Sequence, residues 1–324
     1  MEKETVQKEI AAWMDVAVAY NESFAIKVAR FGDNMRNVGV TEGDKVEAQI
    51  QFGWTVDYFG IGDLVQVIDA VTDEEINDLF EEYHNLYEFD QGDYEAAIWE
   101  AHVKVQVKQE IGIRRFLEAG GYSAFTTNFE DLYGMQQLPG LAVQRLMAEG
   151  YGFAGEGDWK TAAIDRLMKI MAHNKATGFM EDYTYELTEG KEAILQSHMM
   201  EVDPVLAVNK PKIVVSPLSM GDREDPARLV FDGQGGAGVV VSMADFGTHY
   251  KLLINEVDAF EPTEAAPKLP VARVMWTPRP DFHQGVKQWI ETGGGHHTVV
   301  SLALTSDQIE TWAKLVGLDY VTIK

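Results

Sequence analysis

Four short segments carry the residue types that metal binding and proton transfer require. Each places a carboxylate or an imidazole beside glycines or on a predicted strand: Glu156 in 152–159, Glu181 in 180–186, His198 in 197–200 and His297 in 293–299. Carboxylates and imidazoles together suit Mn²⁺ or Co²⁺, with Mg²⁺ also possible. Sequence spacing cannot show that these groups meet, so a shared metal site is a hypothesis at this point.

Glu156 lies where a short apolar strand at 151–154 gives way to a helix that Asp158 is expected to cap. In open α/β sheets, ligand sites form beyond the carboxyl ends of the strands. The glycines on either side of Glu156 permit a sharp turn and the close approach of a ligand. A tight turn carrying a solvated glutamate explains the same residues, and on this segment alone it is the simpler interpretation.

Glu181 shares one face of a predicted strand at 179–187 with Tyr183 and Tyr185. A glutamate between two tyrosines is typical of a pocket, but an exposed polar face would have the same pattern.

The histidines also have simpler interpretations. His198 falls on a predicted strand at 193–203, where a single imidazole is commonly structural. His296 and His297 follow three glycines, and strand alternation would turn them to opposite sides, so one of the two is expected to face a given site. A flexible loop is the alternative for this segment.

The elements that must position these residues follow two patterns. Up to about residue 175, strands alternate with helices, as at 73–87, where Thr72 and Glu75 form a capping box; this predicts a parallel sheet with crossover helices. Short strands separated by turns follow, including 212–218 and 227–232, and predict a β-barrel or sandwich. The expected fold is therefore a parallel-sheet α/β domain followed by an antiparallel β-barrel-like domain. The expected divisions are an N-terminal helix at 1–22, a central domain at 23–175 and a C-terminal domain at 176–324.

Composition and charge exclude several classes of function. The 324-residue chain has 52 Asp and Glu against 27 Lys and Arg, a net charge of −25 that repels nucleic-acid phosphates and anionic lipid. We therefore expect no nucleic-acid partner and no membrane association. The absence of cysteine excludes disulfides, thiolate nucleophiles and cysteine-bound zinc. No secretion signal is recognisable, so the expected location is the cytoplasm.

One glycine-rich motif does not indicate a nucleotide site. Residues 233–238 match the spacing G-x-G-x-x-G, but three valines follow instead of a helix. A dinucleotide fingerprint requires a strand, a turn and then a helix. The motif is therefore predicted to form a hairpin turn.

Longer motifs resemble those of a known family, in the same order and over almost the whole chain from about residue 10. They occupy residues 30–36, 62–67, 125–132, 137–147, 150–160, 179–185, 225–229, 268–272 and 294–299. In these motifs the sequence is similar to the L-arabinose isomerases.

The resemblance implies a metal site and a sugar pocket. In that family two glutamates and two histidines bind a divalent ion, typically Mn²⁺. The matching motifs identify these ligands as Glu156, Glu181, His198 and His297. The same motifs imply that the walls of the sugar pocket are Phe129, Tyr183 and Met199. The resemblance, and not the spacing, is what predicts that the four ligands converge.

The resemblance also implies a reaction. Family members interconvert L-arabinose and L-ribulose, and often D-galactose and D-tagatose. The expected mechanism is a metal-dependent proton transfer through an enediol, with Glu156 and Glu181 jointly providing acid–base catalysis. The sequence does not decide which of the two is the base.

Departures from the family pattern leave alternatives open. Family members carry another α/β domain before the segment equivalent to residue 20, so this sequence is expected to be a compact form without that domain. The alternatives are a related isomerase with a different sugar preference and a truncated, non-catalytic scaffold that binds metal or sugar. A homo-oligomer is the expected assembly.

Overall fold

A four-stranded parallel sheet forms the first part of the computed structural model, which describes residues 3–324 and, for Asp182 and Tyr183, the backbone alone. The strand order is β2-β1-β4-β5. The bounds are β1 Lys27–Phe31, β2 Thr55–Phe59, β4 Ala124–Thr127 and β5 Gly152–Ala154. From β1 the chain proceeds first to one side of the sheet and later to the other. Such a reversal favours a ligand site at the carboxyl ends of the strands.

Helices connect and cover these strands. Their bounds are α1 Lys3–Ser23, α2 Lys45–Phe52, α3 Ile61–Asp69, α4 Asp73–Leu86, α5 Ala96–Gly120, α6 Gly140–Ala148 and α7 Trp159–Met171. The capping box of Thr72 and Glu75 opens α4 as predicted, and Gly121 ends α5 in a left-handed conformation. The α7 helix packs against β4 and β5 on one side and against β6 and β13 on the other. It therefore joins the parallel sheet to the second part of the molecule.

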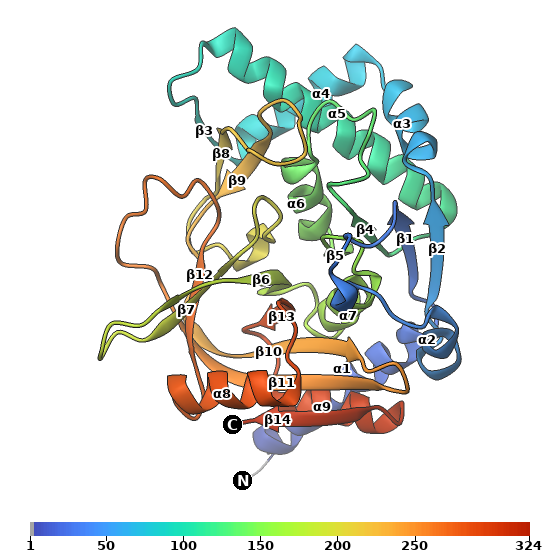
Figure 1. Ribbon diagram of the computed structural model, residues 1–324, viewed down its shortest axis with the longest axis vertical. Coiled ribbons are helices and arrows are strands. Elements are labelled where there is room, and N and C mark those ends of the chain that lie inside the picture. The colour runs from blue at the N-terminus through green and yellow to red at the C-terminus, as the bar shows by residue number, and fades with distance from the viewer. Residues whose placement is uncertain (1–2) are drawn as a thin grey trace.

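The second part is a closed antiparallel barrel, as the sequence predicted. Its six strands follow the order β10-β13-β6-β7-β12-β11, and β10 pairs back with β11 to close it. The bounds are β6 Thr177–Glu186, β7 Ala193–Ser197, β10 Gly236–Asp245, β11 Tyr250–Phe260, β12 Val274–Pro278 and β13 His297–Ser301. A further strand, β14 Asp319–Ile323, pairs in parallel with β11. Figure 1 shows it beside α8 Phe282–Thr292 and α9 Ser306–Leu315, at the end of the molecule that also holds α1.

Two strands predicted for the barrel belong to another sheet. β8 Lys212–Val215 and β9 Ala227–Val230 pair with each other and, through β8, with β3 Glu88–Asp90. The prediction that they join the barrel is wrong. Strand alternation identifies a strand but not its partner, and here the partner comes from a segment more than 100 residues earlier.

Two local predictions also need correction. The strand predicted at 193–203 ends at Ser197, so His198 lies in the turn that follows it. Residues 233–238 form no hairpin: Gly233 makes an isolated bridge to Ala207, and β10 begins at Gly236. They connect one sheet to the next, because β9 and β10 pair with different neighbours.

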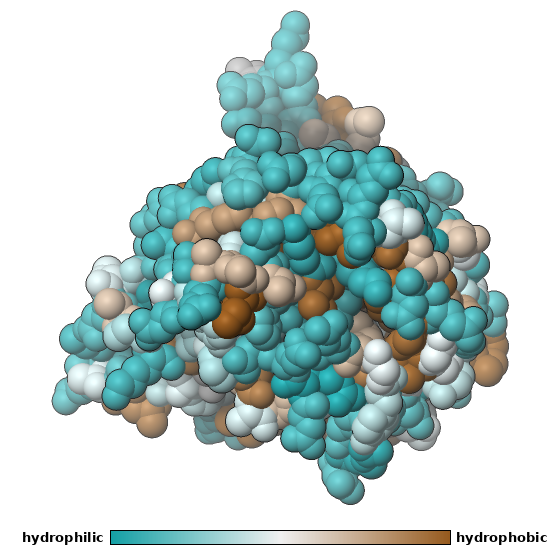
Figure 2. Space-filling model, turned by 90° about the horizontal axis from the view of Figure 1, so that it is seen from above, coloured by the Kyte–Doolittle hydropathy of each residue, from teal (hydrophilic) through white to brown (hydrophobic). Residues whose placement is uncertain are grey.

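The face seen in Figure 2 is mostly hydrophilic, with apolar residues in small, separate groups. Among the residues that the structure describes, no helix is long and apolar enough to cross a bilayer.

Candidate active site

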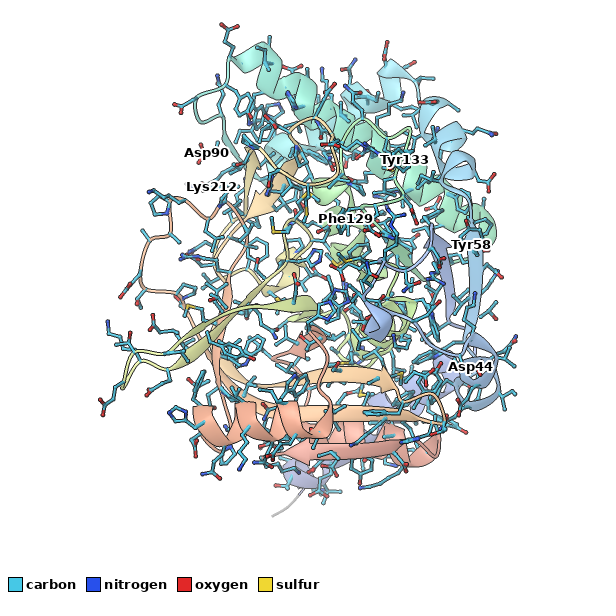
Figure 3. The ribbon with its side chains drawn as sticks, viewed as in Figure 1. Asp44, Tyr58, Asp90, Phe129, Tyr133 and Lys212 are labelled. Atoms are coloured by element: carbon cyan, nitrogen blue, oxygen red, sulfur yellow. The ribbon has the colours of Figure 1, made fainter. Side chains whose placement is uncertain are left out.

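A cavity of about 270 Å³ lies where the residues after β4 and β5 face β6 and the turn after β7. This volume is close to the lower end of small-molecule pockets, about 300–1,000 Å³. Phe129 follows β4 and lies in the middle of the molecule beside α6 (Figure 3). The cavity wall includes Glu156, Glu181, His198, Phe129, Met199 and Met200. Five residues that the sequence predicted as metal ligands or pocket walls therefore line this one cavity: Phe129, Glu156, Glu181, His198 and Met199.

Glu156 adopts an unusual backbone conformation at the edge of this cavity. Its φ is 61°, in the left-handed region that non-glycine residues rarely adopt. Its carbonyl oxygen accepts a hydrogen bond of 2.9 Å from the Met35 amide. A Cβ at Gly155 would lie 2.9 Å from the His198 ring, so glycine is required for that close approach. Strain that neighbouring contacts hold in place is typical of functional sites.

Three neighbouring barrel strands bring the remaining groups together. In β6, Glu181 lies opposite His297 of β13 on one side and opposite Ser197 of β7 on the other. His198, directly after Ser197, therefore comes within 3.9 Å of the Glu181 carboxylate through its Nε2. The Phe179 ring packs on both imidazoles, at 5.0 Å from His198 and 5.1 Å from His297 between ring centroids.

His297 is oriented by Asp158. Its Nδ1 lies 3.1 Å from the Asp158 Oδ2, and its Nε2 lies 3.6 Å from the Glu156 Oε2. A carboxylate only accepts hydrogen bonds, so Nδ1 carries the proton and Nε2 keeps its lone pair. The His297 Nε2 is buried and has no hydrogen-bond partner among the described residues. Only 2% of the His297 side chain is exposed, and it lies behind Glu156 instead of on the cavity wall.

His198 is oriented in the same way by Glu201. The His198 Nδ1 lies 2.6 Å from the Glu201 Oε2, which leaves its Nε2 toward Glu181. Imidazoles that bind metals usually make such a bond from the second ring nitrogen to a carboxylate. Both histidines predicted as ligands therefore have one nitrogen held and the other directed at a glutamate.

The sequence reasoning missed two of these carboxylates and misjudged one histidine. Asp158 was predicted only as a helix cap, a role that it does have for α7. Glu201 was not predicted, although it follows His198 at the short spacing that a turn brings together. His296 was expected to point away if His297 faces the site, and this is wrong: its Nε2 lies 3.2 Å from the Glu156 Oε2. It precedes β13, so strand alternation does not apply to it.

The charges of these groups shift one another. Burial raises the pKa of Glu156, but its bond to His296 and the nearby imidazoles outweigh burial and lower that pKa overall. Burial would lower the pKa of His198, but the charge and hydrogen bond of Glu201 raise it to about 9. Burial lowers the pKa of His297 despite the contact with Asp158. The cluster therefore favours ionised carboxylates.

Two pairs of these donor groups lie at the spacing expected for ligands of a divalent cation. Ligands about 2.1 Å from one octahedral ion lie about 3 Å apart when adjacent and about 4.2 Å apart when opposite. The separations of 3.6 Å for Glu156–His297 and 3.9 Å for Glu181–His198 fall in this range. The unpartnered Nε2 of His297 fits as well. Among the described residues, a set whose donor atoms all lie within 4.8 Å of one another is Glu156, His296 and His297.

The pocket residues predicted from the resemblance have different outcomes. Phe129 and Met199 line the cavity. The Tyr183 side chain lies outside the described residues, although its backbone belongs to β6, next to an irregularity in the pairing with β7.

Comparison with known proteins identifies the family. A family model described as the L-arabinose isomerase central domain matches residues 27–174, and one described as the C-terminal domain matches 176–319. L-arabinose isomerase 2 of Bacillus licheniformis is 76% identical over 100% of this chain and 68% of its own length. The chain belongs to the L-arabinose isomerase family.

Other relatives in this family are also close. L-arabinose isomerase of Oceanobacillus iheyensis is 74% identical over 99% of this chain and 68% of its own length. L-arabinose isomerase of Pediococcus pentosaceus is 56% identical over 99% of this chain and 68% of its own length. Membership in the family makes this chain an isomerase of the intramolecular oxidoreductase class, as the sequence motifs indicated.

Proposed function

We propose that this protein interconverts L-arabinose and L-ribulose at the cavity that Glu156, Glu181 and His198 line. The observation that carries the proposal is that two carboxylates, of Glu156 and Glu181, line one cavity of about 270 Å³. The high identity to proteins named L-arabinose isomerase supports the choice of sugar.

The proposed site holds Mn²⁺, or Co²⁺ or Mg²⁺, on Glu156, Glu181, His198 and His297. The oriented imidazoles and the unpartnered His297 Nε2 support this ligand set. When bound, the ion would act as a Lewis acid that polarises the oxygens at C1 and C2 of the open-chain sugar.

The residues of the chain perform the proton transfer in this mechanism. One carboxylate, of Glu156 or Glu181, removes the proton from C2 to give an enediol, and a proton is returned at C1. The other carboxylate moves the hydroxyl proton between O2 and O1. Phe129, Met199 and Tyr183 are proposed as the walls that hold the sugar chain, and the apolar side chains among them exclude water.

D-Galactose is a second proposed substrate, with D-tagatose as its product. It extends L-arabinose by one carbon, and the cavity wall contains Met199, Met200 and Met220. Methionine is unbranched and adapts its shape, so it can accommodate the additional carbon.

The test is ketose formation from L-arabinose by the purified chain, first with EDTA and then with Mn²⁺. Metal-dependent L-ribulose is the expected result. Bound Mn²⁺ without ketose would contradict isomerase activity in this chain and favour the non-catalytic scaffold. Turnover of another sugar in its place would favour the related isomerase.

Two further proposals concern organisation. We propose that residues 23–175 and 176–324 are separate domains, which the positions of the two family matches support.

We also propose a homo-oligomer. Val6, Ile10, Trp13, Met14 and Val18 of α1 are between 48% and 60% exposed, and an apolar face of this kind supports self-association. Sedimentation of the chain and of Trp13→Glu tests the assembly, and a monomeric wild-type chain would contradict it.

A further inference from the structure

Two lysines of α7 are fully buried, and they lie at opposite ends of the helix. Lys169 lies in the last turn, where the helix dipole favours a cation. Lys160 is the second residue of the helix, where the dipole disfavours one. Burial and position in the helix therefore both disfavour a charged ammonium group at Lys160, so its contacts must stabilise it there.

The contacts of Lys160 lead to the proposed metal centre. Its Nζ donates to the Asp158 Oδ1 at 3.0 Å. The other oxygen of that carboxylate, Oδ2, accepts from the Thr161 hydroxyl at 2.8 Å and meets the His297 Nδ1 at 3.1 Å. Lys160 thus fixes one oxygen of Asp158 and thereby directs the other at His297.

A second bond from Lys160 reaches the loop between β1 and α2, residues 32–44. Its Nζ donates to the Val40 carbonyl at 2.9 Å, and a Cβ at Gly43 would lie 2.7 Å from the Lys160 Cδ. This loop covers the Glu156 backbone, because the Met35 amide donates to the Glu156 carbonyl. The loop and Asp158 therefore meet at one ammonium group.

The geometry points to Lys160 as a positioning residue of the metal centre. It holds Asp158 so that the Nε2 of His297 faces the site, and it holds the 32–44 loop against Glu156. This inference rests on the metal site proposed above.

The test is Mn²⁺ affinity of the full chain after removal of metal, measured from the electron paramagnetic resonance signal of free Mn²⁺. Lys160→Met removes the donor and keeps the apolar length of the side chain. We expect the Kd to rise about tenfold, at the low end of the 10–100-fold typical for outer-shell partners of metal ligands. The Co²⁺ absorption spectrum should change as well, because the ligand geometry loosens.

Lys169→Met is the matched control, because it removes a buried lysine from the same helix. Lys169 contacts Asp165, Asp203 and the carbonyls of Met147 and Tyr151, none of them a proposed metal ligand. It should lower stability but leave the Mn²⁺ Kd and the Co²⁺ spectrum unchanged. An equal loss of affinity in both variants would mean that Lys160 acts only through general stability, which overturns the inference.

A double-mutant cycle tests the route through Asp158. If Lys160 acts on His297 through Asp158, adding Lys160→Met to Asp158→Asn should change the Kd much less than it does in the wild-type background. Independent, multiplicative effects would overturn that route.

Two outcomes separate this inference from the metal site itself. A wild-type chain that binds no Mn²⁺ would overturn both proposals, whereas unchanged binding by Lys160→Met would overturn only this one. If Lys160→Met does not fold, Lys160→Leu replaces it, since this smaller apolar side chain also removes the donor. A folded Lys160→Leu with wild-type affinity and spectrum would also overturn the inference.

Discussion

Two clusters of buried charged groups differ in what they leave open. Around Glu110, one carboxylate oxygen meets the Arg114 guanidinium at 2.5 Å, and the other accepts from Tyr83 and from Arg145. None of these four residues lines the candidate active-site cavity. At the proposed metal centre, by contrast, the His297 Nε2 has no hydrogen-bond partner among the described residues, and Glu156 lines a cavity.

The comparison shows that a shifted pKa alone does not identify a functional site. Burial raises the pKa of Glu110 despite its arginines, so both clusters contain perturbed carboxylates. The Glu110 carboxylate is fully buried, and its two oxygens are paired with Arg114 and Arg145. The Glu156 cluster has ligand atoms that the protein does not satisfy, beside a space of small-molecule size. Open donor atoms together with a cavity therefore separate a chemical site from a structural one.

The largest expected effect is on turnover. Glu156→Gln removes a carboxylate proposed to bind metal and transfer a proton, so ketose formation with Mn²⁺ should fall by about 10³-fold or more. Glu110→Gln is the control, because it makes the same substitution in the other cluster. It should retain the turnover of the wild type at a temperature where it is folded. Comparable turnover of Glu156→Gln and the wild type would contradict the assignment.

The next effect is on stability. Glu110→Gln removes the buried carboxylate that pairs with the mostly buried guanidinium of Arg145 and leaves that guanidinium with the partly exposed carboxylate of Glu149 at 3.6 Å. Breaking such a buried pair costs about 3 kcal/mol or more. Urea unfolding of the metal-free chains measures this loss. Glu156→Gln should lose far less, because the metal-free cluster already contains unpaired atoms; a larger loss there would reverse the comparison.

Metal should stabilise only the open cluster. Mn²⁺ at 100 times its Kd adds about 2.7 kcal/mol to the free energy of unfolding if it binds the folded state alone. Thermal unfolding with EDTA and with Mn²⁺ should show this increment for the wild type and for Glu110→Gln. The same increment in Glu156→Gln would place the metal elsewhere.

The smallest effect is the pH dependence of stability in the metal-free chain. The folded pKa of His198, about 9, exceeds its ordinary value of 6.5. Its contribution is therefore complete below pH 6.5 and is lost as pH rises through about 9. The raised pKa of Glu110 gives the same sign at lower pH, with loss beginning above its ordinary value of 4.5.

Single variants separate the two pH windows. His198→Gln should flatten the decline of unfolding free energy between pH 6.5 and 9, and Glu110→Gln should flatten the decline that starts above pH 4.5. Urea unfolding across this range measures both slopes. A His198→Gln chain with the alkaline decline of the wild type would show that another group causes it.

The sequence by itself determined the local structure and the family. The capping box at Thr72 opens α4 as predicted, because a cap depends on residues three positions apart. Short strands separated by turns predicted a barrel-like domain, and the predicted segments at 179–187 and 193–203 overlap the barrel strands β6 and β7. The long, ordered motifs identified the family and, through it, the four proposed ligands. The spacing of these ligands along the chain does not by itself indicate that they meet.

The tertiary structure alone decided which distant groups meet. It assigned β8 and β9 to a sheet with β3, placed both His296 and His297 beside Glu156, and brought Asp158 to His297 and Lys160 to the 32–44 loop. It also showed that Glu110 belongs to a closed network. The physical reason is the range of the interactions. Caps and strand alternation depend on neighbours in the chain. The pairing of buried charges depends on residues far away in it, such as Glu110 and Arg145, 35 positions apart, and Asp158 and His297, 139 positions apart.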